Sequence, residues 1–127
     1  MRARKRFGQH FLEPAWVAKL LEALNATAED TFLEIGPGRG ALTVPLARMV
    51  RQIVAVEIDR DLATIGAEVF PANVRVVQGD VLQTDLAALL APFPRPIRVV
   101  GNLPYNVSSP ILFALLRAAD EGRQVRD

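Results

Sequence analysis

Four consecutive residues, 102–105, combine groups that could act on a flat nitrogen base. Asn102 carries an amide carbonyl, while Leu103 and Pro104 supply backbone carbonyls, and proline has no N–H to compete as a donor. Tyr105 adds an aromatic face on which a base can stack. Two carbonyls that accept both hydrogens of an aromatic amine would turn its lone pair toward a donor. Because a sulfonium methyl needs only such positioning, we interpret these residues as a methyl-transfer site for an amine such as N6 of adenine.

A glycine-rich segment, LEIGPGRGAL, follows the first apolar run and contains Gly36 and Gly38. Glycine allows the backbone to approach a ligand closely, and a following helix would direct its amide dipoles there. Gly36, Gly38 and Ala41 also match the dinucleotide fingerprint, with Glu57 placed to hold the ribose of NAD. The loop alone is therefore equally compatible with a nicotinamide enzyme and an S-adenosylmethionine enzyme, and a tight turn without a ligand is the third possibility.

Acidic residues end the next two apolar runs. Glu57 could accept both hydroxyls of a ribose, and Ile58 could lie against an adenine ring. Asp80 could accept the N6 hydrogens of adenine, and Val81 could pack against the ring. Each acid alone fits a strand-terminal turn or the start of a helix. Together with the glycine loop they predict one adenosine site, because the carboxyl ends of parallel strands meet at one edge of a sheet.

Strands and helices alternate in the predicted order of elements. Strands are predicted over 31–36, 52–58, 74–80 and 96–102, and helices over 14–24, 41–50, 61–70, 85–90 and 109–119. The continuous hydrophobicity of the strands is typical of strands covered on both faces. This alternation predicts an α/β fold, a parallel sheet with right-handed crossovers and helices on both faces.

Composition limits the classes of function. With 127 residues, 50% of them hydrophobic, the chain has room for one domain. It contains no cysteine and one histidine, which excludes disulfides and thiolate chemistry and predicts that there is no metal site. No apolar run is long enough for a membrane span or a secretory signal, so we expect a soluble, cytoplasmic protein.

The amino terminus is basic although the net charge is only +1. Its basic residues are Arg2, Arg4, Lys5 and Arg6. A basic arm of this kind predicts contact with the phosphates of RNA, and a solvated terminus is the alternative.

Several motifs in order resemble one family. The segments KRFGQHFL, EIGPGRGALT, EIDRDL, GD and GNLPYNVSSPIL are similar to those of the ribosomal RNA adenine dimethyltransferases, from Lys5 to about Leu116. The resemblance implies a Rossmann-like class I methyltransferase fold with S-adenosylmethionine as cofactor. It also implies N6-dimethylation of two adjacent adenosines near the 3′ end of small-subunit ribosomal RNA, with that RNA and the small ribosomal subunit as partners in ribosome biogenesis.

The resemblance also assigns roles to residues. His10, which replaces an asparagine of some relatives, and Leu12 would contact S-adenosylmethionine, and Gly36 would face its methionine part. Glu57 would hold the ribose and Asp80 the adenine amine, while Asn102 would touch both cofactor and target nitrogen. The cofactor-binding residues expected in full are His10, Leu12, Gly36, Gly38, Glu57, Ile58, Asp80, Val81 and Asn102.

Members of this family continue beyond the fourth strand with three further strands and a helical domain. Residues 1–127 are therefore expected to be the amino-terminal part of the catalytic domain, with residues 1–13 as basic arm and cofactor-contacting segment. The resemblance implies the strand order 3-2-1-4, in which the fourth strand of such a fragment would become a sheet edge. We therefore expect the fragment to be inactive on its own and to self-associate through that strand. Two other functions stay open, a nicotinamide-dependent oxidoreductase and a non-catalytic RNA-binding assembly factor. Asp80 and the NLPY segment argue against the first, and intact Asn102 and Tyr105 argue against the second.

Overall fold

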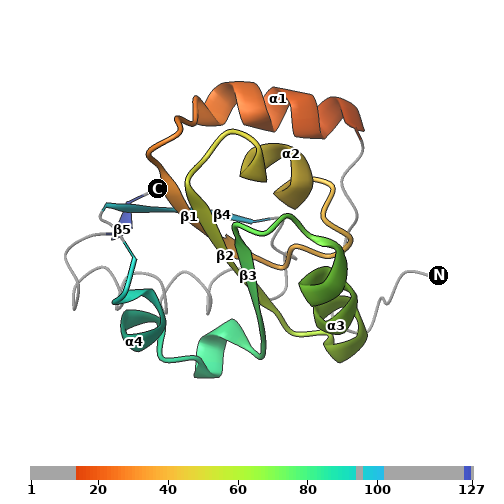
Figure 1. The fold of residues 1–127 in the computed structure, drawn as a ribbon, viewed down its shortest axis with the longest axis vertical. Helices are drawn as coiled ribbons and strands as arrows, with labels where there is room; N and C mark the ends of the chain where they lie inside the picture. Colours follow the sequence, from red (N-terminus) through yellow and green to blue (C-terminus); the bar gives the residue numbers. More distant parts are fainter. Residues whose placement is uncertain (1–13, 94–95, 102–124, 127) are drawn as a thin grey trace.

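The computed structural model describes residues 14–93, 96–101 and 125–126 (Figure 1). Its elements in chain order are α1 (Pro14–Leu24), β1 (Thr31–Ile35), α2 (Thr43–Ala47), β2 (Gln52–Glu57), α3 (Arg60–Val69), β3 (Val74–Gln78), the 3-10 helix η2 (Val81–Gln83), α4 (Leu86–Leu90), β4 (Ile97–Gly101) and β5 (Val125–Arg126). The predicted alternation is confirmed, although α2 is shorter than expected. The helix predicted over 109–119 lies outside the described residues. None of the helices between residues 14 and 93 combines the length and apolar character needed to cross a bilayer.

The described strands form one parallel sheet in the order β3-β2-β1-β4-β5. At the end of β1, Ile35 lies beside Val56 of β2 and Gly101 of β4. One strand further out, Glu57 lies beside Gln78 of β3. The carboxyl ends of the four longer strands therefore meet at one edge, as the sequence predicts for a ligand site.

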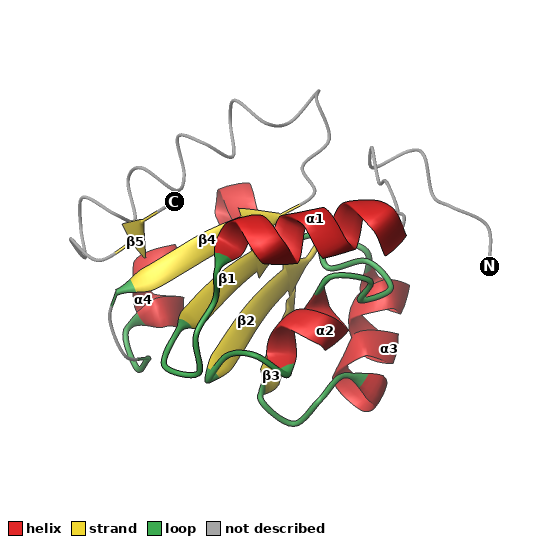
Figure 2. Cartoon of the chain, turned by 90° about the horizontal axis from the view of Figure 1, so that it is seen from above, coloured by secondary structure: helices red, strands yellow, loops and turns green. Residues whose placement is uncertain are grey.

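Side chains alternate between two cores, one on each face of the sheet. On one face, Phe32 and Ile53 pack with residues of α1 and α2, among them Val17 and Leu46. The opposite core combines residues of the strands with residues of η2 and α4, and its members are Leu33, Ile35, Val54, Val56, Val81, Leu86, Leu90, Ile97 and Val99. The two views agree with this layering, because α1 and α2 lie on one side of the sheet and α4 on the other (Figures 1 and 2).

Two expectations about the outer strands need correction. β3 is not covered on both faces, because each of its residues is either exposed or half-buried at the outer edge of the described sheet. β4 is not left as an open edge along its whole length, since β5 pairs with Ile97 and Arg98. The sheet therefore extends one short strand past the predicted end, and this pairing covers the first part of β4.

The charged side chain of β4 is also engaged. Arg98 forms an ion pair with Asp30, with 3.3 Å between Nη1 and Oδ2, and its guanidinium lies 4.9 Å from the ring centroid of Phe32. Both partners belong to β1 or the residue before it. The contact therefore joins the amino-terminal ends of the two adjacent strands, opposite the edge where the ligand site is expected.

A single amide side chain closes the connection after α2. Asn73 donates through Nδ2 to the carbonyl oxygens of Ala47 at 2.9 Å and Val50 at 3.2 Å. Ala47 is the last residue of α2 and Val50 follows it, so their carbonyls lie at and beyond the helix end, where the helix supplies no donor of its own. Asn73 thus ties the start of β3 to the end of α2.

Substitution of Asn73 tests this contact. We expect Asn73→Ala to lower the free energy of unfolding by about 1 kcal/mol, because the helix-end carbonyls lose a donor. Asn73→Asp should lower it further, since a carboxylate of the same shape faces carbonyl oxygens. Urea denaturation of both variants measures their free energies of unfolding. An aspartate variant as stable as the unsubstituted chain would contradict the contact.

Candidate functional site

The glycine loop connects β1 to α2 through three residues with left-handed backbone. Gly36, Gly38 and Gly40 have φ angles of +70°, +58° and +88°. The Gly36 amide donates to the carbonyl of Val56 at 2.9 Å, which keeps the start of the loop beside β2. A Cβ added at Gly36 would meet no atom within 4 Å. Gly36 is therefore required by its backbone angle, and the space beside it is open to a ligand.

Glu57 organises this edge of the sheet. Its Oε1 accepts the Gly38 amide at 2.9 Å and its Oε2 accepts the Asp59 amide at 3.0 Å. Its backbone carbonyl accepts the amide of Gly79 at 2.8 Å. The side chain is buried, with 2% exposure. One residue therefore links the glycine loop, the turn into α3 and the turn after β3.

The acids that follow the strands also begin helices. Asp59 accepts the Leu62 amide through Oδ1 at 3.1 Å and caps α3. Asp80 accepts the Leu82 amide through Oδ1 at 2.9 Å and caps η2. Asp85 caps α4 in the same way, through the Ala88 amide. The structure therefore confirms that Asp80 serves as a local turn residue. Its contact with adenine stays a prediction.

Two apolar residues proposed to contact adenine differ in exposure. Ile58 is 38% exposed, and its carbonyl accepts Nε2 of Gln78 at 3.1 Å. Val81 is only 5% exposed and packs in the core with Leu86. Ile58 therefore has side-chain surface available for a planar ligand, whereas most of Val81 is already covered.

The structure brings together the predicted site residues that it describes. Glu57 contacts Gly38 directly and reaches Gly79, the neighbour of Asp80, through its carbonyl. The other predicted site residues lie outside the described residues: Arg2, Arg4, Lys5, Arg6, His10, Leu12, Asn102, Leu103, Pro104 and Tyr105. Within residues 14–93, 96–101 and 125–126, no group of three or more His, Cys, Asp or Glu side chains could hold a metal ion.

Sequence reasoning missed a second buried carboxylate in the same region. Glu34 of β1 is 3% exposed, and its Oε1 accepts the hydroxyl of Thr43 at 2.7 Å. Burial raises the pKa of Glu34 to about 7, the Thr43 hydrogen bond opposes the rise, and the charge of Glu57 adds to it. The signal was an acid inside the otherwise apolar run TFLEIG. A carboxylate at such a position must be buried when its neighbours form a central strand.

The fold and the strand-end motifs define a class I methyltransferase, and comparison with known proteins identifies the family. A family model described as "Ribosomal RNA adenine dimethylase" matches residues 1–126. The chain belongs to this family.

Curated relatives are longer than this chain. "Ribosomal RNA small subunit methyltransferase A" of Bordetella pertussis is 49% identical over 127 residues, which cover 98% of this chain and 45% of the relative. The protein of the same name from Pseudomonas syringae pv. tomato is 51% identical over 121 residues, which cover 93% and 45%. The chain therefore spans about half the length of the curated relatives it matches.

Solved structures share the fold. A dimethyladenosine transferase from Plasmodium falciparum matches with a TM-score of 0.69 and 29% identity, over 85% of this chain and 38% of that one. The 23S rRNA methyltransferase ErmE matches with a TM-score of 0.74 and 30% identity, over 92% and 45%. These matches confirm the predicted Rossmann-like class I methyltransferase fold.

The raised pKa of Glu34 predicts a pH dependence of stability. Because the folded-state pKa is about 7 and the ordinary value is 4.5, the folded chain holds more protons than the unfolded chain between these pH values. Stability attributable to Glu34 is therefore lost as the pH rises through this window. Glu34→Gln removes the titration, so its stability relative to the unsubstituted chain should rise by on the order of 3 kcal/mol from about pH 5 to about pH 8.

Urea denaturation across this pH range measures the difference. Glu68→Gln, which changes an exposed glutamate of α3, is the matched control. A constant difference in stability between Glu34→Gln and the unsubstituted chain would show that Glu34 does not titrate in this window.

Proposed function

We propose that the protein carrying this sequence transfers methyl groups from S-adenosylmethionine to N6 of two adjacent adenosines near the 3′ end of small-subunit ribosomal RNA. Membership of the ribosomal RNA adenine dimethylase family and the names of its relatives support the reaction and the substrate. The structural observation that carries the proposal is the Gly38–Glu57 hydrogen bond at 2.9 Å. It joins a left-handed glycine loop and a strand-end acid into one site, as a bound adenosine requires.

The residues at this edge fit S-adenosylmethionine. The open space beside Gly36 admits the methionine part, and the buried Glu57 provides carboxylate oxygens that can each accept more than one hydrogen bond. Ile58 offers exposed apolar surface to the adenine ring, and Asp80 is assigned to the adenine amine. The cofactor supplies an electrophilic methyl on a positive sulfur. Glu57 and Asp80 orient it, and acidic groups beside the site favour a cationic ligand.

The acceptor side is assigned to residues 102–105. β4 ends at Gly101 beside Ile35, and a Cβ at Gly101 would lie 2.7 Å from the Ile35 carbonyl oxygen. β4 therefore reaches the ligand edge in close contact with β1, and Asn102 follows Gly101 directly in the chain. Asn102, Leu103 and Pro104 accept the hydrogens of the target amine, and Tyr105 stacks on a target base turned out of the RNA.

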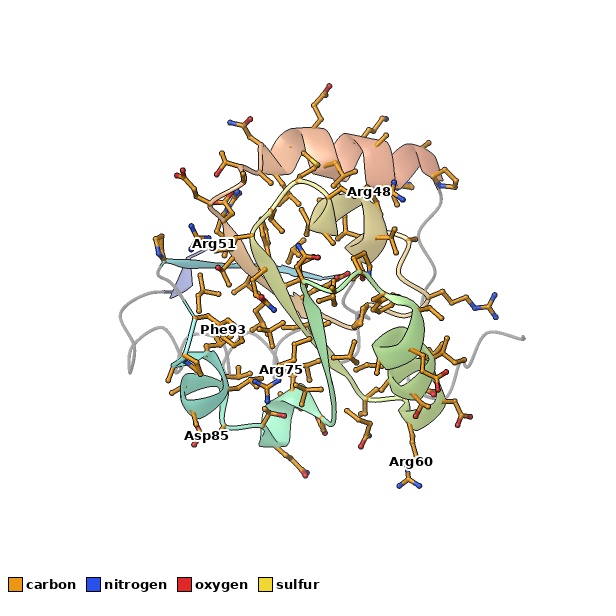
Figure 3. All side chains as sticks on the ribbon, in the orientation of Figure 1. Arg48, Arg51, Arg60, Arg75, Asp85 and Phe93 are labelled. Atoms are coloured by element: carbon orange, nitrogen blue, oxygen red, sulfur yellow. The ribbon has the colours of Figure 1, made fainter. Side chains whose placement is uncertain are left out.

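Contact with ribosomal RNA is assigned to the basic arm. Arg2, Arg4, Lys5 and Arg6 would neutralise phosphates of the small subunit in a salt-sensitive manner. By contrast, the labelled arginines of the described part come from three different segments, and Arg60 at the start of α3 points away from the sheet (Figure 3). The protein acts in the cytoplasm, where ribosomes are assembled. Self-association of residues 1–127 through β4 would use the part beyond Arg98.

Cofactor binding tests the donor site. We expect S-adenosylmethionine to bind and Glu57→Ala to weaken binding by about 1 to 3 kcal/mol, because a charged acceptor is lost. Isothermal calorimetry of the full-length protein measures both, with Glu68→Ala on the exposed side of α3 as control. Tighter binding of NADH than of S-adenosylmethionine would refute the assignment and favour an oxidoreductase.

Methyl transfer tests the acceptor site. In the full-length protein, Asn102→Ala should reduce transfer to undermethylated small subunits by about two orders of magnitude or more, because the nucleophile loses its orientation. Tyr105→Ala should also impair transfer, whereas Tyr105→Phe should retain much of it because stacking needs only the ring. A phenylalanine variant as inactive as the alanine variant would disprove the stacking role. Full cofactor binding without any transfer by the unsubstituted protein would favour a non-catalytic assembly factor.

A further inference from the structure

We propose that Phe70 is a positioning residue that holds the glycine loop in the shape required to bind the methyl donor. The side chain is wedged between Gly40 of the loop and Gly66 of α3, and neither glycine has room for a side chain. The proposal rests on the proposed function only in naming the methyl donor as the ligand of the loop.

The two glycines leave the space that the Phe70 ring fills. A Cβ at Gly40 would lie 2.4 Å from Cε1 of Phe70, and a Cβ at Gly66 would lie 2.7 Å from Cε2. Cε1 and Cε2 are on opposite edges of the ring. The ring therefore contacts α3 along one edge and the glycine loop along the other.

The backbone keeps Phe70 in this place. Its amide donates to the Gly66 carbonyl at 2.9 Å as the last contact of α3, and its own backbone is extended, with ψ of 157°. The ring is thus anchored one turn after Gly66, where the chain leaves the helix.

Gly40 transmits the position of the ring to the rest of the loop. Its amide donates to the Pro37 carbonyl at 2.9 Å, and its carbonyl accepts the Val44 amide at 3.0 Å. Gly40 therefore closes the turn that contains Gly38 and begins the hydrogen bonds of α2. A displacement of Gly40 would move Gly38, whose amide is held by Glu57.

These contacts connect Glu57, α3, Phe70 and the glycine loop to one another around the site. Glu57 holds the amide of Asp59, which caps the start of α3, and Phe70 directly follows the last residue of α3. The Phe70 ring then contacts Gly40, and the loop returns to Glu57 through Gly38. α3 is thereby fixed to the site at both ends, and a change at either glycine that touches Phe70 alters the loop that Glu57 holds.

Gly66→Ala is the sharpest test of this role. Gly66 has ordinary helical backbone inside α3, so alanine raises the helix propensity there. Its methyl group would nevertheless press the Phe70 ring toward Gly40. We expect this overpacking to lower the affinity of the full-length protein for S-adenosylmethionine about tenfold. The free energy of unfolding should fall by less than the free energy of cofactor binding.

Relief of the contact should restore the loop. In the double variant Gly66→Ala/Phe70→Leu, the smaller side chain leaves room for the new methyl group, and affinity should recover to within about threefold. Thr64→Ala is the matched control, because it also raises helix propensity in α3 at an exposed position. It should leave cofactor affinity unchanged.

Amide hydrogen exchange of the protein without cofactor provides a second measurement. Gly66→Ala should speed exchange at the Gly38 amide, and the double variant should reverse the change. This measurement tests the role of Phe70 even if the unsubstituted protein does not bind S-adenosylmethionine. Absence of that binding would refute the proposed function but not the positioning role of Phe70. Three results would overturn the positioning role. The first is unchanged cofactor affinity and amide exchange in Gly66→Ala, and the second is a double variant that binds the cofactor as weakly as the single variant. The third is a loss of cofactor affinity matched by an equal loss in the free energy of unfolding.

Discussion

The site depends on the way that one buried carboxylate satisfies backbone amides. A carboxylate removed from water is stable only if its oxygens find donors, and Glu57 finds them in Gly38 and Asp59. Neither donor belongs to a regular element, since one lies in the loop after β1 and the other in the turn before α3. The same pair of hydrogen bonds therefore compensates the burial of Glu57 and fixes two irregular segments that a ligand must contact.

A second carboxylate at this edge is held differently. Glu34 has a hydroxyl partner in Thr43, and burial brings its pKa to about 7. Two buried carboxylates of neighbouring strands repel each other when both are ionised, so protonation of Glu34 near neutral pH limits the charge that the site must hold. Glu57 instead accepts two backbone amides, so it is the carboxylate that holds the segments around the proposed ligand.

The sequence predicts the frame of this site well, because its signals are local. Apolar runs end at an acid or a glycine, and parallel pairing brings those ends to one edge, so Gly36, Gly38, Glu57 and Asp80 could be assigned to one region in advance. The order of the first four strands follows from the resemblance, but the half-exposed β3 and the two-residue β5 could not be predicted, because exposure at a sheet edge leaves no periodic signal. The contacts that refine the site are also non-local. Asn73 reaches Ala47, and Phe70 reaches Gly40, across separations at which residue type alone indicates no partner.

The donor and acceptor sides of the proposed reaction are encoded in different parts of the chain. Within the part of the chain that the structure describes, the contacts that shape the donor side join residues between Glu34 and Thr84, so this part of the geometry for holding a methyl donor is encoded in three consecutive strand-helix units. The acceptor segment instead follows β4, which returns to the centre of the sheet beside β1. This crossover places Gly101 beside Ile35, directly before the glycine loop, although the two residues are far apart in the sequence. Because β4 approaches β1 closely at Gly101, small changes in the pairing of these two strands would move the acceptor relative to the donor, which makes their register the constraint that joins binding to chemistry.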